Sequence, residues 1–213
     1  MKRELVVVGG GEHARVVIEA AQLSGQWSVV GYTDVAAVVE TSERLGVRWL
    51  GDDDAYVASG SGAAVVLGIG LTIGRPATSR LRALGCYRDA TLAAVIHPSA
   101  VVSPTATIAP GAVILARAVV NSGARIGAHA IVNTGAIVEH DVAVGVHVHL
   151  GPGVVIGGGA EIGDHAQVAL GACVRDHVRV GREAVVAMGT VVVRDVADGE
   201  RVAGVPGRPF NAG

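Results

Sequence analysis

A strict six-residue repeat limits what this chain can fold into more than any other feature. From Val95 to Val196 the sequence divides into 17 blocks of six residues without an insertion. The second residue of every block is Ile, Val or Leu, and the sixth is Ala, Val or Thr. A period of six matches neither the 3.6-residue turn of an α-helix nor the two-residue alternation of an ordinary strand. It predicts a short strand followed by a corner, with one aliphatic side chain turned inward per block.

Three such blocks close one triangular coil of 18 residues, so the repeat region makes between five and six coils. Stacked coils pair as parallel strands about 4.8 Å apart, which gives a prism on the order of 27 Å tall. Small residues at the sixth position suit the tight interior corners. Residues 95–196 are therefore predicted to form a left-handed parallel β-helix of hexapeptide repeats.

The composition supports a regular β core and excludes several classes of protein. Half of the 213 residues are hydrophobic but only 3% are aromatic, so the core must consist of Val, Ile, Leu and Ala, which favours thin parallel β layers. The formal net charge of −2 provides no basic field for nucleic acid. The two cysteines, Cys86 and Cys173, form neither a CxxC motif nor a disulfide framework.

No apolar run approaches the roughly 20 residues that a membrane-spanning helix needs. The apolar stretch after Glu4 is too short for a signal peptide. We therefore expect a cytoplasmic protein without membrane insertion.

Residues 1–94 show a different pattern, in which predicted strands alternate with predicted helices. The strands are expected at 5–8, 28–32 and 63–69, and the helices at 12–24, from 52 onward and at 73–84. This alternation predicts a small Rossmann-like βαβαβ domain with a parallel sheet. Residues 197–213 are expected to form a C-terminal tail that packs on the β-helix.

A glycine-rich turn joins the first predicted strand to the first helix. Residues 9–14 fit the pattern G-x-G-x-x-A, and Asp34 follows Ala14 by 20 residues. Glycines at this place let backbone N–H groups approach a phosphate at the helix N-terminus, although a purely structural tight turn would also use glycine. A domain of about 94 residues is small for a two-lobed dinucleotide fold, so we expect a mononucleotide or a nucleotide sugar.

Polar residues interrupt the aliphatic repeat between Asn133 and Asp141. His140 takes the fourth place of its block, near a corner and directed outward, and Asp141 follows it. A carboxylate beside a histidine fixes the tautomer and stabilises the imidazolium, which is the arrangement of a general base. A chance Glu-His-Asp sequence on a solvated corner is the alternative.

Three further histidines, His129, His147 and His165, are 18 residues apart and must stack in one column. Neutral imidazoles are good zinc ligands, but a ladder of histidines cannot converge on one ion without another chain. A solvent-facing or interface ladder is the favoured interpretation, and no metal is expected. His149 follows His140 by nine residues, so it faces another side and could complete a site only across a subunit boundary.

Taken together, these features resemble the nucleotide-sugar N-acetyltransferases of the left-handed β-helix class, a group that includes sialic acid O-acetyltransferase-like enzymes. The segments that carry the resemblance span nearly the whole chain: GGGEHARVV, GYTD, LGIG, VNTGAIVEHD, HVHLGPGVVIGGG and AGVPGRP. The resemblance implies direct transfer of acetyl from acetyl-CoA to the amine of a nucleotide-linked amino sugar. It also implies a homotrimer with active sites between subunits, acetyl-CoA between neighbouring prisms and the nucleotide sugar on the N-terminal domain.

The resemblance also implies roles for single residues. His140 would be the catalytic base, and Asp141 the acid that raises its basicity. The implied substrate contacts are Gly11, Glu12, His13, Asp34, Gly70 and Asn133, and the implied acetyl-CoA contacts are His149, Gly158 and Leu170. Two positions depart from the family: Glu12 stands where Gly or Ser is frequent, and Val35 where a second acid is common. An acid at position 12 fits poorly against a diphosphate.

Three other functions stay open at this point. An O-acetyltransferase acting on a sugar hydroxyl would use the same fold, cofactor and base. A zinc-dependent, carbonic-anhydrase-like hydrolase is also built on a trimeric prism, but position 170, where a further histidine is expected, is Leu. A non-catalytic nucleotide-binding prism would leave the Glu139–Asp141 cluster without a purpose.

Overall fold

The computed structural model describes residues 2–71 and 78–210. The chain divides into two compact units, with the boundary between Pro98 and Ser99. We call them the N-terminal unit and the prism. Among the described residues, no helix combines the length and apolar character that crossing a membrane requires.

The N-terminal unit is built around a parallel sheet with the strand order β2-β1-β3. Its elements are β1 (Arg3–Val8), α1 (Glu12–Ser24), β2 (Trp27–Thr33), α2 (Val39–Leu45), α3 (Asp53–Ala58), β3 (Ala64–Leu67), α4 (Thr78–Cys86) and β4 (Val95–Ile96). Strand β1 is central because residues 5–8 are apolar and at most 1% exposed. The chain passes from β1 to β2 on one side and later to β3 on the other. The carboxyl end of β1 is therefore a switch point, where α/β sheets bind ligands.

The predicted helices are found, with one addition. Helix α1 has the expected bounds, and Asp52 accepts a hydrogen bond from the Ala55 N–H as the N-cap of α3. Helix α2 was not predicted, because among its residues only Thr41 is buried and no apolar period marks it. The predicted helix over 73–84 begins outside the described residues, and its described part lies in α4.

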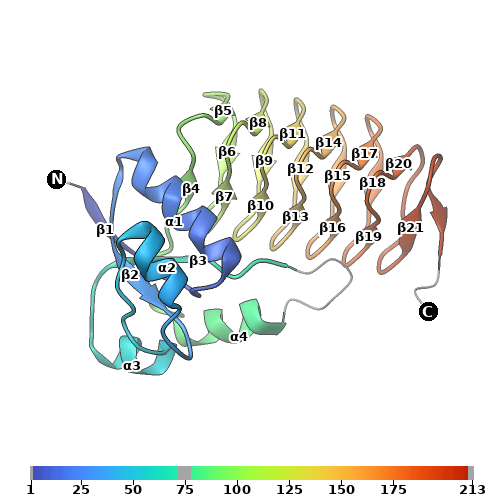
Figure 1. Cartoon of the computed structure of the whole chain (residues 1–213). Coiled ribbons are helices and arrows are strands. Elements are labelled where there is room, and N and C mark those ends of the chain that lie inside the picture. Colours follow the sequence, from blue (N-terminus) through green and yellow to red (C-terminus); the bar gives the residue numbers. More distant parts are fainter. Residues whose placement is uncertain (1, 72–77, 211–213) are drawn as a thin grey trace. The chain divides into compact units, whose positions relative to one another are not determined.

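Beyond Pro98 the chain forms the predicted prism of short parallel strands, whose stacking is visible in Figure 1. Its strands are β5 (Val101–Val102), β6 (Thr107–Ile108), β7 (Val113–Ile114), β8 (Val119–Val120), β9 (Arg125–Ile126), β10 (Ile131–Val132), β11 (Ile137–Val138), β12 (Ala143–Val144), β13 (His149–Leu150), β14 (Val155–Ile156), β15 (Glu161–Ile162), β16 (Gln167–Val168), β17 (Cys173–Val174), β18 (Arg179–Val180), β19 (Val185–Val186), β20 (Val191–Val192), β21 (Arg201–Ala203) and β22 (Arg208–Pro209). The strands form three walls with the orders β5-β8-β11-β14-β17-β20, β6-β9-β12-β15-β18 and β7-β10-β13-β16-β19-β21-β22. The predicted 18-residue register is confirmed, since Ile137 pairs with Val155. The tail extends one wall, because β21 pairs in parallel with β19, and β22 then pairs antiparallel with β21.

The corners of the prism decide which side chains face outward. Residues at the fifth position of the block, from Gly111 to Gly189, have φ between +54° and +76°. The sixth residue then turns inward, and Ala112, Ala136 and Val142 are fully buried. Side chains at the fourth and fifth positions are left to point out at the corner. This geometry presents His140 and Asp141 at the prism surface.

Candidate active site

His140 and Asp141 stand at the corner between β11 and β12. Asp141 has φ +59°, a left-handed conformation that Asp adopts more readily than most residues. Nδ1 of His140 lies 3.0 Å from Oδ2 of Asp141, and the two side chains are 61% and 70% exposed. A neutral imidazole therefore donates its Nδ1–H to the carboxylate and keeps the lone pair on Nε2.

The surroundings of His140 make it a stronger base. The hydrogen bond to Asp141 is the main cause that raises the pKa of His140 above its ordinary value, while desolvation lowers it. The negative charges of Asp141 and Glu139 raise it further. All three favourable contributions stabilise the imidazolium that would form when Nε2 accepts a proton.

Gly158 lies one coil after His140, against the basic nitrogen. A Cβ added at Gly158 would lie 2.5 Å from Nε2 of His140, so only glycine leaves the ring its present place. Within the described part of the chain, the N–H of Gly158 donates no hydrogen bond, whereas those of Gly157 and Gly159 do. The structure therefore brings a free lone pair and a free backbone donor together at one corner.

Asn133 and His149 form a second polar pair on the prism. Nδ2 of Asn133 lies 3.3 Å from Nε2 of His149, and His149 is only 8% exposed. The contact follows from the pairing of β10 with β13, which places the two residues on neighbouring coils. Leu170 is 57% exposed at another position of the prism. Within the described residues, Leu170 takes part neither in the contact between His140 and Gly158 nor in that between Asn133 and His149.

The column of His129, His147 and His165 is confirmed, but His129 and His147 do not face solvent, and the interface alternative stays a prediction. The rings stack with centroids 4.9 and 5.1 Å apart, and His129 and His147 are 8% and 6% exposed. The stacking buries them because each ring covers the next. In the described residues, no group of three or more His, Cys, Asp or Glu side chains is placed to share a metal ion.

The glycine-rich turn of the N-terminal unit is ordered by Asp34. Oδ2 of Asp34 accepts the N–H of Gly10 at 2.7 Å, and Oδ1 accepts the N–H of Val35 at 2.7 Å. The N–H of Gly9 is bonded to the carbonyl of Thr33. These two glycine amides are therefore already used. The donors left for an anion are those of Gly11 and the first turn of α1.

The other predicted residues of this turn differ in accessibility. Gly11 and Glu12 are exposed, whereas His13 packs against Gly70, where an added Cβ would lie 3.1 Å from Cβ of His13. Nε2 of His13 is buried and has no hydrogen-bond partner among the described residues. Burial, together with the charge of Arg80, lowers the pKa of His13 to about 4, which keeps the imidazole neutral.

A cavity of about 450 Å³ opens at the carboxyl ends of the three parallel strands, at the switch point beside β1. Asp34, Asp52, Asp53 and Asp54 line it from the strand ends and α3, and Arg82 lines it from α4. Asp52–Asp54 form the start of a helix, as the sequence predicts. The cavity itself cannot be predicted from the sequence, because α4 must fold against α3 to form it.

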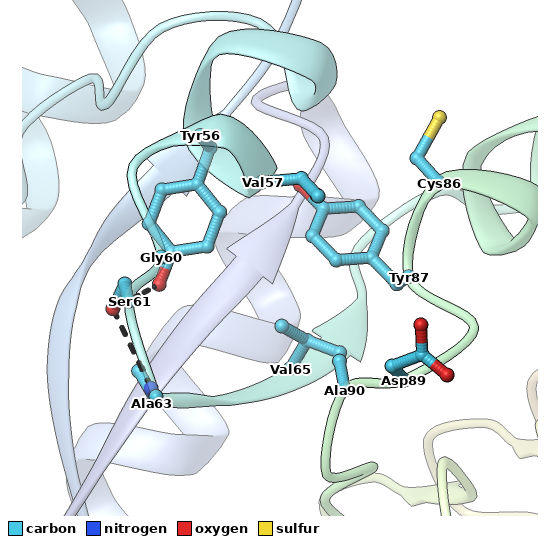
Figure 2. A pocket seen from close by; sticks show the side chains of 11 residues that line it. Tyr56, Val57, Gly60, Ser61, Ala63, Val65, Cys86, Tyr87, Asp89 and Ala90 are labelled. Carbon is cyan, nitrogen blue, oxygen red and sulfur yellow. Dashed lines mark hydrogen bonds between the residues drawn. The ribbon is translucent and has the colours of Figure 1, made fainter.

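A smaller cavity of about 230 Å³ lies between α3 and the residues after α4 (Figure 2). The rings of Tyr56 and Tyr87 line it with their centroids 6.4 Å apart. The hydroxyl of Tyr87 donates to Oδ1 of Asp53 at 2.9 Å. The ring of Tyr87 therefore lines the smaller cavity, and its hydroxyl is hydrogen-bonded to Asp53, which lines the larger cavity.

Comparison with known proteins finds one matching family model and several related solved structures. Residues 4–78 match the model of the PglD N-terminal domain family. PerB from Caulobacter crescentus, solved with CoA and GDP-perosamine, is 34% identical with a TM-score of 0.86, over 98% of this chain and 97% of that one. The acetyltransferase domain of PglB from Neisseria gonorrhoeae FA1090, solved with acetyl coenzyme A, is 32% identical with a TM-score of 0.85, over 99% and 100%.

WeeI from Acinetobacter baumannii AYE shares the fold at 21% identity, with a TM-score of 0.83 over 98% of this chain and 100% of that one. No curated protein matches the sequence significantly.

Proposed function

The chain belongs to the left-handed β-helix acetyltransferases that carry a PglD-type N-terminal domain, and we propose that it transfers acetyl from acetyl-CoA to the amine of a nucleotide-linked amino sugar. The structure of PerB with CoA and GDP-perosamine supports the proposed acetyl donor and acceptor. The structure of the PglB domain with acetyl coenzyme A supports the donor. The observation that carries it is the corner where Nε2 of His140 lies against Gly158, whose N–H donates no hydrogen bond within the described residues.

His140 acts as the general base in this proposal. As the amine nitrogen attacks the thioester carbon, a C–N bond forms and the amine proton moves to Nε2. Asp141 stabilises the resulting imidazolium through Nδ1, 3.0 Å away. The C–S bond then breaks, and the CoA sulfur leaves and takes up a proton. Base catalysis of this kind contributes about 10²–10⁴ in rate.

Gly158 supplies the complementary charge stabilisation. The attack places negative charge on the carbonyl oxygen, and a preorganised backbone N–H at that point stabilises it. The N–H of Gly158 is the donor that we assign, because it is beside the base and unbonded in the described structure. His149, Leu170 and Asn133 stay predictions for the acetyl-CoA and substrate contacts.

The nucleotide belongs to the N-terminal unit in this proposal. The amides of Gly11, Glu12 and His13 are the donors for the diphosphate, and Asp34 positions the turn rather than touching the phosphate. The side chain of Glu12 is exposed, so it can point away from the anion. Gly70 supports this turn from behind His13.

We further propose a homotrimer whose active sites lie between subunits. The exposure of His140, at 61%, supports this arrangement, because one chain leaves the imidazole open and a closed site strengthens the electrostatic interactions and protects the thioester from water. A cytoplasmic location stays a prediction from the sequence.

The direct test follows thiol release from acetyl-CoA with a panel of nucleotide amino sugars. Each amine is paired with the nucleotide sugar that carries a hydroxyl at the same carbon. The proposal expects release only with an amine, together with a product heavier by one acetyl group. Release with the hydroxyl partner alone would replace N-transfer by O-transfer. No release with any acceptor would contradict the proposal.

A further inference from the structure

We infer that Asp53 makes the nucleotide site selective for guanine, an inference that rests on the proposed function and names its base. The large cavity of the N-terminal unit holds about 450 Å³ at the switch point of the sheet. What distinguishes one base from another is the pattern of donors and acceptors on its edges. The lining of this cavity has such a pattern.

The carboxylate of Asp53 is held by two hydroxyls on the same oxygen. Oγ1 of Thr33 donates to Oδ1 at 2.7 Å and the Tyr87 hydroxyl donates to Oδ1 at 2.9 Å. Thr33 is fully buried and Tyr87 is 4% exposed, so both donors are fixed by the core. Within the described residues, Oδ2 accepts no hydrogen bond. The site therefore presents one oriented, unused acceptor, and burial raises the pKa of Tyr87, which keeps its hydroxyl a donor.

The opposite charge comes from α4. Arg82 lines the same cavity as Asp53 and is the cation among four aspartates. Guanine carries two adjacent donors, N1–H and the 2-amino group, on one edge and the acceptors O6 and N7 on another. Arginine is the usual partner of O6 and N7, and a carboxylate accepts from ring and amino N–H groups. Asp53 and Arg82 match these two edges.

The charges that line the cavity disfavour a diphosphate or a pyrimidine base in it. Asp34, Asp52, Asp53 and Asp54 repel a diphosphate, which places the phosphates at the glycine-rich turn and the base in the cavity. Uracil and thymine present N3–H between two carbonyl oxygens, so one of these oxygens would face the acids. Burying such an acceptor without a donor is unfavourable.

Binding of GDP, IDP and UDP to the full-length protein, measured by calorimetry, tests the inference. IDP differs from GDP only in its base, hypoxanthine, which lacks the 2-amino group of guanine. We expect GDP to bind about tenfold more tightly than IDP, and UDP more weakly than both. UDP binding at least as tightly as GDP would overturn the inference but leave the proposed function standing. Binding of none of the three would overturn it together with the nucleotide part of that function.

Two variants test whether Asp53 contacts the base or the ribose. The ribose is shared by GDP, IDP and UDP. Asp53→Asn keeps an acceptor for Thr33 and Tyr87. We expect this variant to bind GDP and IDP with about equal affinity. Arg82→Gln should weaken GDP and IDP equally, because both carry O6 and N7. Asp89 lines the smaller cavity and not this one, so Asp89→Asn removes the same charge as a control and should change neither the GDP affinity nor the IDP affinity. An unchanged ratio of GDP to IDP affinity in Asp53→Asn, or an equal loss for GDP, IDP and UDP, would overturn the inference.

Discussion

At the scale of single residues, His140 and Gly158 depend on each other for space. Gly158→Ala would place a methyl group 2.5 Å from Nε2. The exposed ring can swing away, so the protein should stay folded while the base leaves its position. We expect kcat to fall about 100-fold, the typical cost of displacing a catalytic group by about 1 Å, with an unchanged melting temperature. Gly85→Ala, with open space around its Cβ, is the control. Normal turnover in Gly158→Ala would contradict this role.

Asp141 acts on the same base through its charge. His140 must be unprotonated to act, so activity is lost as pH falls through its pKa, which Asp141 raises. Asp141→Asn keeps a hydrogen-bond acceptor and tolerates the positive φ. We expect the acid limb of the kcat/KM profile to move to lower pH, and the plateau to fall about tenfold or more. A limb that stays in place would show that the carboxylate does not set the basicity.

At the scale of elements, the turn between β1 and α1 depends on a side chain from the end of β2. Asp34→Ala would leave the N–H of Gly10 without its 2.7 Å partner. Because that turn presents the amides of α1, we expect KM for the nucleotide sugar to rise about tenfold, with KM for acetyl-CoA unchanged. Asp89→Ala removes an exposed acid of the same unit as a control. An unchanged KM for the nucleotide sugar, or an equal rise in both KM values, would contradict this role of Asp34.

The elements also show why parts of the molecule could be predicted. The prism follows from its period, because a buried aliphatic residue at every sixth step allows few other folds. The 18-residue coil also places Gly158 beside His140, a signal readable from the sequence. Asp53 could not be found in this way, since its partners Thr33 and Tyr87 come together only through tertiary packing. Helix α2 carries one buried residue, too few for a pattern.

At the scale of the whole molecule, the proposal requires copies of the chain to act together. A 21.4 kDa chain should give a particle of about 64 kDa by light scattering if it is a trimer. The reason is that a base 61% exposed in one chain needs a neighbouring prism to exclude water from the thioester. A monomer of full activity at assay concentration would remove the inter-subunit site.

The base at the prism corner is tested most directly by comparing two histidines of that prism. His140→Asn and His177→Asn each remove an exposed imidazole, and Asn tolerates the positive φ of position 177. With a saturating nucleotide amino sugar and acetyl-CoA, we predict that His140→Asn loses about 10²–10⁴ in kcat while His177→Asn keeps the wild-type rate. Equal rates in the two variants would contradict general-base catalysis by His140.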